Sequence, residues 1–150
     1  MRIVVQRVRR ASVKVSGNLV SEIGRGMLVL VGVEKGDSET DAEWLAAKSA
    51  NLRIFDDESG VMNKSLIETG GEILAVSQFT LTASTRKGNR PSYIRAAGHE
   101  LAVPLYDTFC ESLSVLTGKI VKKGIFGADM QVELINDGPV TIIIDSRLKE

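Results

Sequence analysis

The first 33 residues consist of short strand-forming runs separated by glycine-containing turns, and this pattern restricts the fold more than any other feature. The runs cover residues 3–9, 12–16, 19–23 and 27–33 and are rich in branched apolar side chains. Gly17-Asn18 and the segment Gly24-Arg25-Gly26 interrupt them where a chain that reverses direction needs turn residues. The sequence therefore predicts a β-meander at the start of the chain.

Two later segments repeat apolar residues at the spacing of an amphipathic helix. The first spans residues 41–52 and follows several helix-capping side chains between Asp37 and Thr40. The second spans residues 99–116 and should end at Gly118, with Pro104 tolerated only within its first turn. Its apolar stripe is formed by Leu101, Leu105, Phe109, Leu113 and Leu116.

The remaining strand signals lie between and after these helices. Residues 72–79 are apolar enough for a central strand, and further strands are expected over residues 119–123, 130–136 and 140–145. Residues 55–71 indicate a long loop or two short irregular strands, and residues 82–92 a polar loop. A length of 150 residues suits one domain covering residues 1–150. We therefore expect an α+β fold, a mostly antiparallel β-sheet or barrel with two main amphipathic helices.

The segment ELINDGPVTIIID places Gly138-Pro139 between two apolar strand-like runs. Asp137-Gly138 alone would suit a tight hairpin turn. Pro139 removes a backbone donor and restricts the preceding residue, and neither effect is needed to close such a turn. A plain turn between strands is one interpretation; a rigid element with a separate function is the other.

Composition excludes several kinds of chemistry. The chain has one histidine, His99, and one cysteine, Cys110, so an internal disulfide and the common zinc sites are excluded. Nothing places His99 near a nucleophile, and no glycine-rich nucleotide-binding motif occurs. No metal and no cofactor are expected. The N-terminus is no signal peptide and no apolar run is long enough to span a bilayer, so we expect a cytoplasmic protein without a membrane partner.

Charge is balanced, with 19 basic and 19 acidic residues, which argues against a general DNA-coating protein. The basic residues are nevertheless clustered. The segment STRKGNRPSYIR carries Arg86, Lys87, Arg90 and Arg95. A solvated loop and a local phosphate-contacting patch are both compatible with this cluster.

The motif SQFTL, residues 77–81, brings polar side chains to the end of the expected central strand. The simple interpretation is a strand that becomes polar where it meets solvent. The functional interpretation is the floor of a pocket, in which the backbone N–H groups of Phe79 and Thr80 stabilise a developing oxyanion.

SQFTL and NDGPVT (residues 136–141) together resemble the D-aminoacyl-tRNA deacylases. The likeness extends along the whole chain, through QRV at residue 6 with the following ASV, the TRKGNRPSY loop and GIFGADMQVELINDGPVT. Each short motif alone is weak evidence for the family, whereas the two motifs together, in this order and at this spacing, are specific to it.

The resemblance implies an enzyme that hydrolyses the ester of D-aminoacyl-tRNA, and also mischarged glycyl-tRNA. It implies a catalytic set of Ser77, Gln78, Phe79 and Thr80 that acts on the 3′-terminal aminoacyl-adenosine. It further implies a homodimer in which a cis Gly138-Pro139 unit enters the partner subunit's site and rejects L-amino acids. Phe126 and Met130 are expected to line the adenosine pocket, although both also suit a core, and Arg7 is expected to steady the Gly-Pro loop.

Two alternatives for the catalytic step stay open. Positioned N–H groups with the 2′-hydroxyl of the terminal ribose account for hydrolysis without a histidine, and we favour them. Thr80 as a nucleophile is the other, although no neighbouring residue in the sequence is placed to take its proton. Two non-enzymatic alternatives are an RNA-binding module and a structural dimer whose Gly-Pro turn only joins strands.

Overall fold

The computed structural model describes residues 1–150 and is built around one long strand, β1 (Arg2–Val15). On one edge, residues 2–8 pair antiparallel with β3 (Gly26–Gly32) and residues 11–15 with β2 (Asn18–Ile23). Its other edge pairs antiparallel with β8 (Gln131–Asp145). The separate strands predicted over residues 3–9 and 12–16 are thus one strand, because Arg10 between them keeps its ladder position opposite Ile135.

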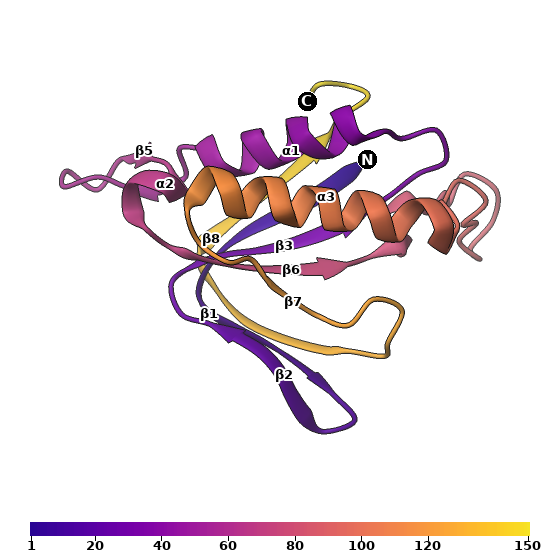
Figure 1. The fold of residues 1–150 in the computed structure, drawn as a ribbon, viewed down its shortest axis with the longest axis horizontal. Coiled ribbons are helices and arrows are strands. Elements are labelled where there is room, and N and C mark those ends of the chain that lie inside the picture. Colours follow the sequence, from indigo (N-terminus) through magenta and orange to yellow (C-terminus); the bar gives the residue numbers. More distant parts are fainter.

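The sheet continues from β3 through two parallel pairs. β6 (Glu72–Ser77) lies parallel to β3, and β7 (Lys122–Lys123) lies parallel to β6. The far end nearly closes onto β2, where Ser21 Oγ donates to the Lys123 carbonyl at 2.6 Å and Lys122 Nζ to the Glu22 carbonyl at 2.8 Å. The fold is therefore α+β and barrel-like as expected, with a mixed sheet in which parallel pairs supplement the antiparallel ones (Figure 1).

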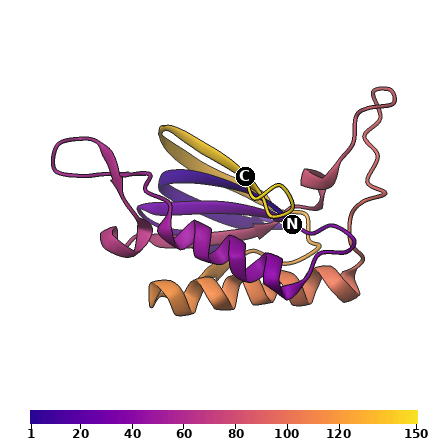
Figure 2. The same cartoon turned by 90° about the horizontal axis from the view of Figure 1, so that it is seen from above.

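Helices α1 (Glu39–Asn51) and α3 (His99–Thr117) lie side by side on one face of the sheet (Figures 1 and 2). Both helices agree with the prediction, and α3 ends at Gly118, whose φ of 67° is left-handed. Pro104 lies in the second turn of α3 rather than the first. The helix is amphipathic, and Leu113 is the last of its buried residues along the chain. None of the helices combines the length and the hydrophobicity that a membrane span requires.

The core has two parts because alternate residues of the inner strands face opposite sides of the sheet. Met27, Val29 and Val31 of β3 pack toward the helices, whereas Leu28 packs on the other face. In β6, Ile73 and Ala75 join the first cluster and Leu74 and Val76 the second. With both faces buried, β6 lies at the centre of the fold, as its apolar sequence predicts.

Residues 55–71 form the two short strands that were one of the two expected outcomes, followed by a short helix that was not predicted. β4 (Phe55–Asp56) pairs with β5 (Met62–Lys64), and α2 (Leu66–Thr69) follows. α2 begins with a capping box, in which the Ser65 side chain accepts from the Glu68 N–H and the Glu68 carboxylate accepts from the Ser65 N–H.

The segment around Gly138-Pro139 is not a hairpin turn, and the expectation of separate strands over residues 130–136 and 140–145 is wrong. Both parts belong to β8 and run in the same direction along β1. Thr141 pairs with Gln6 and Asn136 with Val8, so residues 137–140 bulge opposite Arg7 alone. The strand is held together across the bulge because the Val140 N–H donates to Asn136 Oδ1 at 2.7 Å.

Candidate active site

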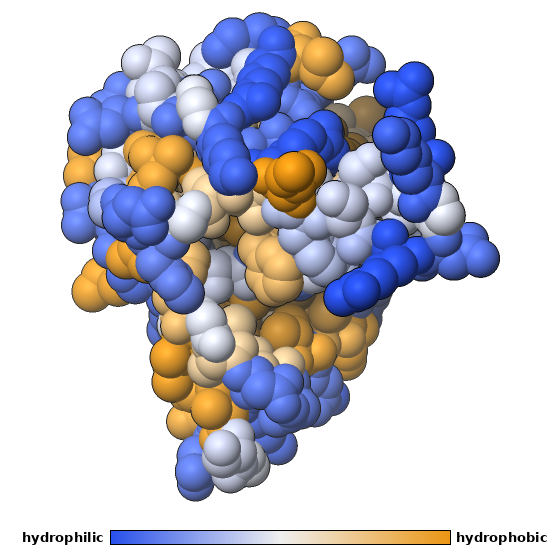
Figure 3. All heavy atoms as spheres, turned by 90° about the vertical axis from the view of Figure 1, so that its right-hand side faces the viewer, coloured by the Kyte–Doolittle hydropathy of each residue, from blue (hydrophilic) through white to orange (hydrophobic).

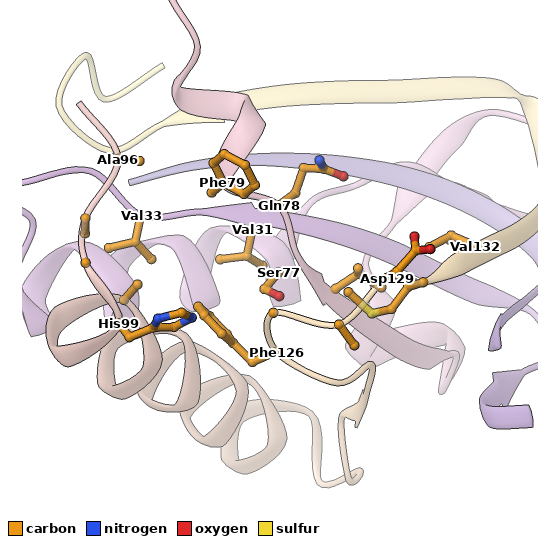
Figure 4. Close-up of a pocket in the computed structure, with 17 residues that line it drawn as sticks. Val31, Val33, Ser77, Gln78, Phe79, Ala96, His99, Phe126, Asp129 and Val132 are labelled. Carbon is orange, nitrogen blue, oxygen red and sulfur yellow. The ribbon is translucent and has the colours of Figure 1, made fainter. Parts of the chain in front are cut away.

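A pocket of about 540 Å³ opens at the C-terminal end of β6. Five of the residues predicted from the sequence line it, namely Ser77, Gln78, Phe79, Phe126 and Met130. Most of the lining is apolar, and the polar groups gather where β6 ends, as in many small-molecule sites. Figure 4 shows Gln78 and Phe79 on one wall, His99 and Phe126 on the opposite wall, and Ser77 between them.

The pocket floor is formed by a change of backbone geometry just after β6. The strand ends at Ser77, two residues earlier than predicted, and the 3₁₀ helix η1 (Phe79–Thr82) follows. The first bond of this turn runs from the Leu81 N–H to the Gln78 carbonyl at 3.2 Å. The N–H groups of Phe79 and Thr80 therefore have no acceptor within the turn, as at any helix N-terminus.

Thr80 lies beside the pocket but is not among the residues that line it. Its hydroxyl oxygen accepts a hydrogen bond from the Gln78 side-chain amide. No histidine, carboxylate or lysine is hydrogen-bonded to it, so no base within the chain is placed to take its proton. The arrangement presents backbone donors more directly than an activated hydroxyl.

Phe126 is fixed by two aromatic neighbours on α3. Its ring centroid lies 5.4 Å from that of His99 and 5.7 Å from that of Tyr106, both in edge-to-face geometry. The Tyr106 hydroxyl donates to the Ala75 carbonyl at 3.0 Å, and burial raises the pKa of this phenol, so it stays a neutral donor. Of these three rings, His99 and Phe126 line the pocket, and Tyr106 packs against Phe126.

The other residues that line the pocket were not predicted as site residues. His99 lines the pocket from the start of α3, Asp129 from the loop before β8, and residues 96–98 from the segment that leads into α3. The sequence places His99 at a helix start, but only the tertiary arrangement brings that start beside the end of β6. Asp129 is exposed and makes no hydrogen bond or ion pair within the chain.

Arg7, Gly138 and Pro139 lie together, and none of them lines this pocket. The peptide bond between Gly138 and Pro139 is cis. Arg7 Nε donates to the Asp137 carbonyl at 2.8 Å, and Asn136 Nδ2 donates to Thr141 Oγ1 at 3.1 Å. None of the residues 137–140 lines the larger pocket, whereas Arg7 and Asp137 line a second cavity of about 250 Å³.

The face of the molecule that carries the basic loop shows apolar surface framed by hydrophilic side chains (Figure 3). Phe79 is exposed and contacts Tyr93 edge to face, with ring centroids 5.0 Å apart. The Arg95 guanidinium donates to the Thr82 carbonyl at 3.2 Å, which ties the segment before α3 to η1. The expected polar loop is present here, with Ser84 and Ser92 paired through both backbone N–H groups at 2.9 Å.

The fold is a small α+β domain, and the pocket at the end of β6 is a mostly apolar site with a few polar residues, as in many enzymes. The family model described as D-Tyr-tRNA(Tyr) deacylase matches residues 4–145. The chain therefore belongs to the D-Tyr-tRNA(Tyr) deacylase family, and is an enzyme of the hydrolase class.

Individual relatives agree with this assignment. The D-aminoacyl-tRNA deacylases of Bacteroides thetaiotaomicron and Parabacteroides distasonis are 64% and 63% identical, with each pair covering all of both chains. A solved structure described as a c-Myc DNA unwinding element binding protein is 46% identical with a TM-score of 0.90, covering 97% of this chain and 98% of its own. A probable eukaryotic D-amino acid tRNA deacylase, 20% identical with a TM-score of 0.81 over 95% of this chain and 97% of its own, shares the fold.

Proposed function

We propose that this protein hydrolyses the ester bond of D-aminoacyl-tRNA and releases the free D-amino acid and the tRNA. The observation that carries the proposal is the pocket at the end of β6, where the N–H groups of Phe79 and Thr80 are left without an acceptor in η1. Two such donors suit a carbonyl oxygen that becomes negative during ester hydrolysis. The family of the chain supplies the substrate class.

In the proposed reaction, water adds to the ester carbonyl and the resulting oxyanion is stabilised by the Phe79 and Thr80 N–H groups. The bond to the ribose oxygen then breaks, and that oxygen takes the proton that the added water loses. The 2′-hydroxyl of the terminal ribose assists this transfer, because no side chain near Thr80 is placed as a base. Ser77 and Gln78 orient the ester, and Phe126 and Met130 contact the terminal adenosine.

We further propose that the site is completed by a second copy of the chain. Gly138 and Pro139 lie outside the pocket of their own subunit, so a gating role for them requires the pocket of another. In such a homodimer the Gly-Pro backbone stands near the α-carbon of the amino acid. A D-side chain points away from it and an L-side chain collides with it, which is discrimination by steric exclusion.

Two finer points complete the proposal. Glycine has no side chain to collide with the gate, so mischarged glycyl-tRNA is a second substrate. The tRNA substrate indicates the cytoplasm as the place of action.

The experiment that tests the proposal compares D-Tyr-tRNA with L-Tyr-tRNA at low enzyme concentration. Release of D-tyrosine should be faster with the protein than without it, whereas L-Tyr-tRNA should decay at its spontaneous rate. Equal decay of both substrates with and without protein contradicts the proposed activity.

A nucleic-acid-binding function without catalysis is the second candidate, since one solved relative is described as a DNA unwinding element binding protein. The balanced charge of the chain argues against it, because duplex DNA binding depends on many phosphate contacts. We therefore propose tRNA rather than DNA as the partner. Deacylation that persists in a large excess of duplex DNA is the expected result.

A further inference from the structure

The guanidinium of Arg7 is a buried charge placed opposite the bulge of β8. Arg7 is only 8% exposed, and it lies between the ladder pairs Gln6–Thr141 and Val8–Asn136, which enclose residues 137–140. A charge withdrawn from water is tolerated only when hydrogen bonds and an opposite charge compensate it. The groups that compensate Arg7 therefore also determine where it lies.

The Arg7 guanidinium contacts the bulge through Nε, and it contacts the start of the β4–β5 hairpin through Nη1. Nε donates to the Asp137 carbonyl at 2.8 Å, whereas Nη1 donates to the Ile54 carbonyl at 2.7 Å and to Asp56 Oδ1 at 3.2 Å. The Asp137 carboxylate lies 3.9 Å from Nε and is shared with Arg9 Nε at 3.2 Å. Asp56 is thus the carboxylate within hydrogen-bond distance of the Arg7 guanidinium.

Packing alone does not fix this guanidinium, because the cavity of about 250 Å³ lies beside it. Arg7, Asp56 and Asp137 all line that cavity. A long side chain next to open volume has several rotamers within reach, so its hydrogen bonds select one. A methyl group on Gly138 would lie 3.3 Å from Arg7 Nη2, so the guanidinium lies directly against the Gly-Pro unit.

We propose that Asp56 is a positioning residue, which through Arg7 fixes the Gly138-Pro139 segment in the place that the substrate requires. The inference rests on the proposed function of that segment as a gate. It assigns a role in substrate discrimination to a hairpin that is distant in sequence from both SQFTL and NDGPVT. Asp56 does not touch the substrate and acts only through the guanidinium.

The test compares Asp56→Asn and Asp56→Ala with Asp57→Asn as a matched control. Asp57 is the next residue on the hairpin, but its carboxylate accepts from the Ser59 and Val61 N–H groups, and asparagine keeps an oxygen for those bonds. Loss of a charge-assisted bond at a half-exposed carboxylate should lower kcat/KM for D-Tyr-tRNA about threefold in Asp56→Asn and about tenfold in Asp56→Ala. Hydrolysis of L-Tyr-tRNA should not fall in parallel, so the ratio of D to L rates decreases. Asp57→Asn should match the wild type.

A second measurement does not depend on activity. Amide hydrogen exchange, followed by mass spectrometry, should be faster in the peptide that contains Val140 for both Asp56 variants, and unchanged there for Asp57→Asn. The proposal would be overturned if Asp56→Ala had the same hydrogen exchange and the same D-to-L ratio as the wild type. It would also be overturned if the Asp57→Asn control changed as much as the Asp56 variants. If the wild-type protein does not hydrolyse D-Tyr-tRNA, the proposed function fails, and hydrogen exchange alone decides whether Asp56 positions the bulge.

Discussion

At the scale of single residues, the position of the Thr80 hydroxyl separates the two catalytic alternatives. It accepts a bond from the Gln78 amide and has no base beside it. Thr80→Val removes the hydroxyl and keeps both the shape and the backbone N–H. We expect its turnover of D-Tyr-tRNA to stay within about tenfold of wild type, whereas loss of a true nucleophile costs on the order of 10⁶-fold in a serine protease. Single-turnover deacylation measures the difference, and a fall to the uncatalysed rate identifies Thr80 as the nucleophile.

Gly138 is a position where the backbone leaves no room for a side chain. Its φ is 142°, and an added Cβ would lie 2.8 Å from Val140 Cγ2. Gly138→Ala should therefore displace the bulge and lower D-Tyr-tRNA turnover by up to about 10²-fold, the effect of a shift near 1 Å in a site. Glycyl-tRNA turnover should fall similarly.

Gly17→Ala is the matched control for Gly138→Ala, since Gly17 has a φ of 78° and open space where the methyl would stand. Its activity should equal that of wild type, although the strained backbone lowers the melting temperature slightly. Equal activity in Gly138→Ala would contradict a role for the bulge in the reaction.

At the scale of elements, Arg2 joins the start of β1, the end of β8 and η1. Its guanidinium donates to Asp145 Oδ2 at 2.8 Å and to the Leu81 carbonyl at 3.0 Å. Burial alone would raise the pKa of Asp145, but the bonds from Arg2 and the Arg147 N–H outweigh it and hold the pKa below its ordinary value. The ionised carboxylate is therefore favoured by folding.

Asp145→Asn should lower the free energy of unfolding by about 1 kcal/mol at pH 7, a value reduced because Arg2 is partly exposed to solvent. A lowered pKa stabilises the fold above the unfolded-state pKa, near 4, and this stabilisation disappears as pH falls through the folded-state pKa. Urea unfolding at pH 7 and at pH 3 or below should show the gap between variant and wild type narrowing in acid. A gap independent of pH would contradict the assignment.

The loop over residues 83–92 is the element that we expect to contact the tRNA body. Neutralising Arg86 and Lys87 together should raise KM several-fold, leave kcat nearly unchanged and reduce the salt slope of binding by about 1 to 2. Neutralising Lys14 and Lys119, which are exposed elsewhere, changes the net charge equally and serves as the control. An unchanged KM and salt slope would exclude this loop from the interface.

The elements also show how far local sequence determines this structure. α1, α3 and the central strand follow from periodicity, because each buries one face or both faces in a regular way. β8 does not follow, because Gly138-Pro139 has the local signature of a turn while its flanking residues pair with β1. The side chains of Asn136 and Arg7 replace the missing ladder bonds, and sequence spacing alone does not reveal contacts across 130 positions.

In the site, too, some residues are predictable from local sequence and others only from the tertiary structure. Ser77, Gln78 and Phe79 are recognisable as polar or exposed residues at a strand end, and the structure brings them together with Phe126 and Met130. His99 and Asp129 carry no local signal of this kind. Their place in the pocket depends on how α3 and the loop before β8 meet the end of β6, which is a tertiary property.

At the scale of the whole molecule, the proposed gating role of Gly138-Pro139 requires two copies of the chain, since this segment does not line the pocket of its own chain. We expect a two-fold homodimer at assay concentrations, measured by sedimentation velocity. A fully active monomer would contradict the shared site.

Subunit mixing tests the shared site most directly. One variant, Gly138→Ala, damages the donated segment, and the other, Ala128→Trp, fills the pocket with an indole at a lining position in a loop. Each homodimer should be folded and nearly inactive on D-Tyr-tRNA. A mixed dimer pairs one intact pocket with one intact Gly-Pro segment from the other subunit.

After unfolding and refolding an equal mixture, half of the dimers are mixed and each contains one complete site. We predict recovery of about a quarter of the wild-type rate, with D-selectivity restored, because the complete site is assembled across the dimer. If pocket and gate instead act within one subunit, no dimer contains a complete site. A mixture that stays as inactive as its two components, although mixed dimers form, would contradict the account.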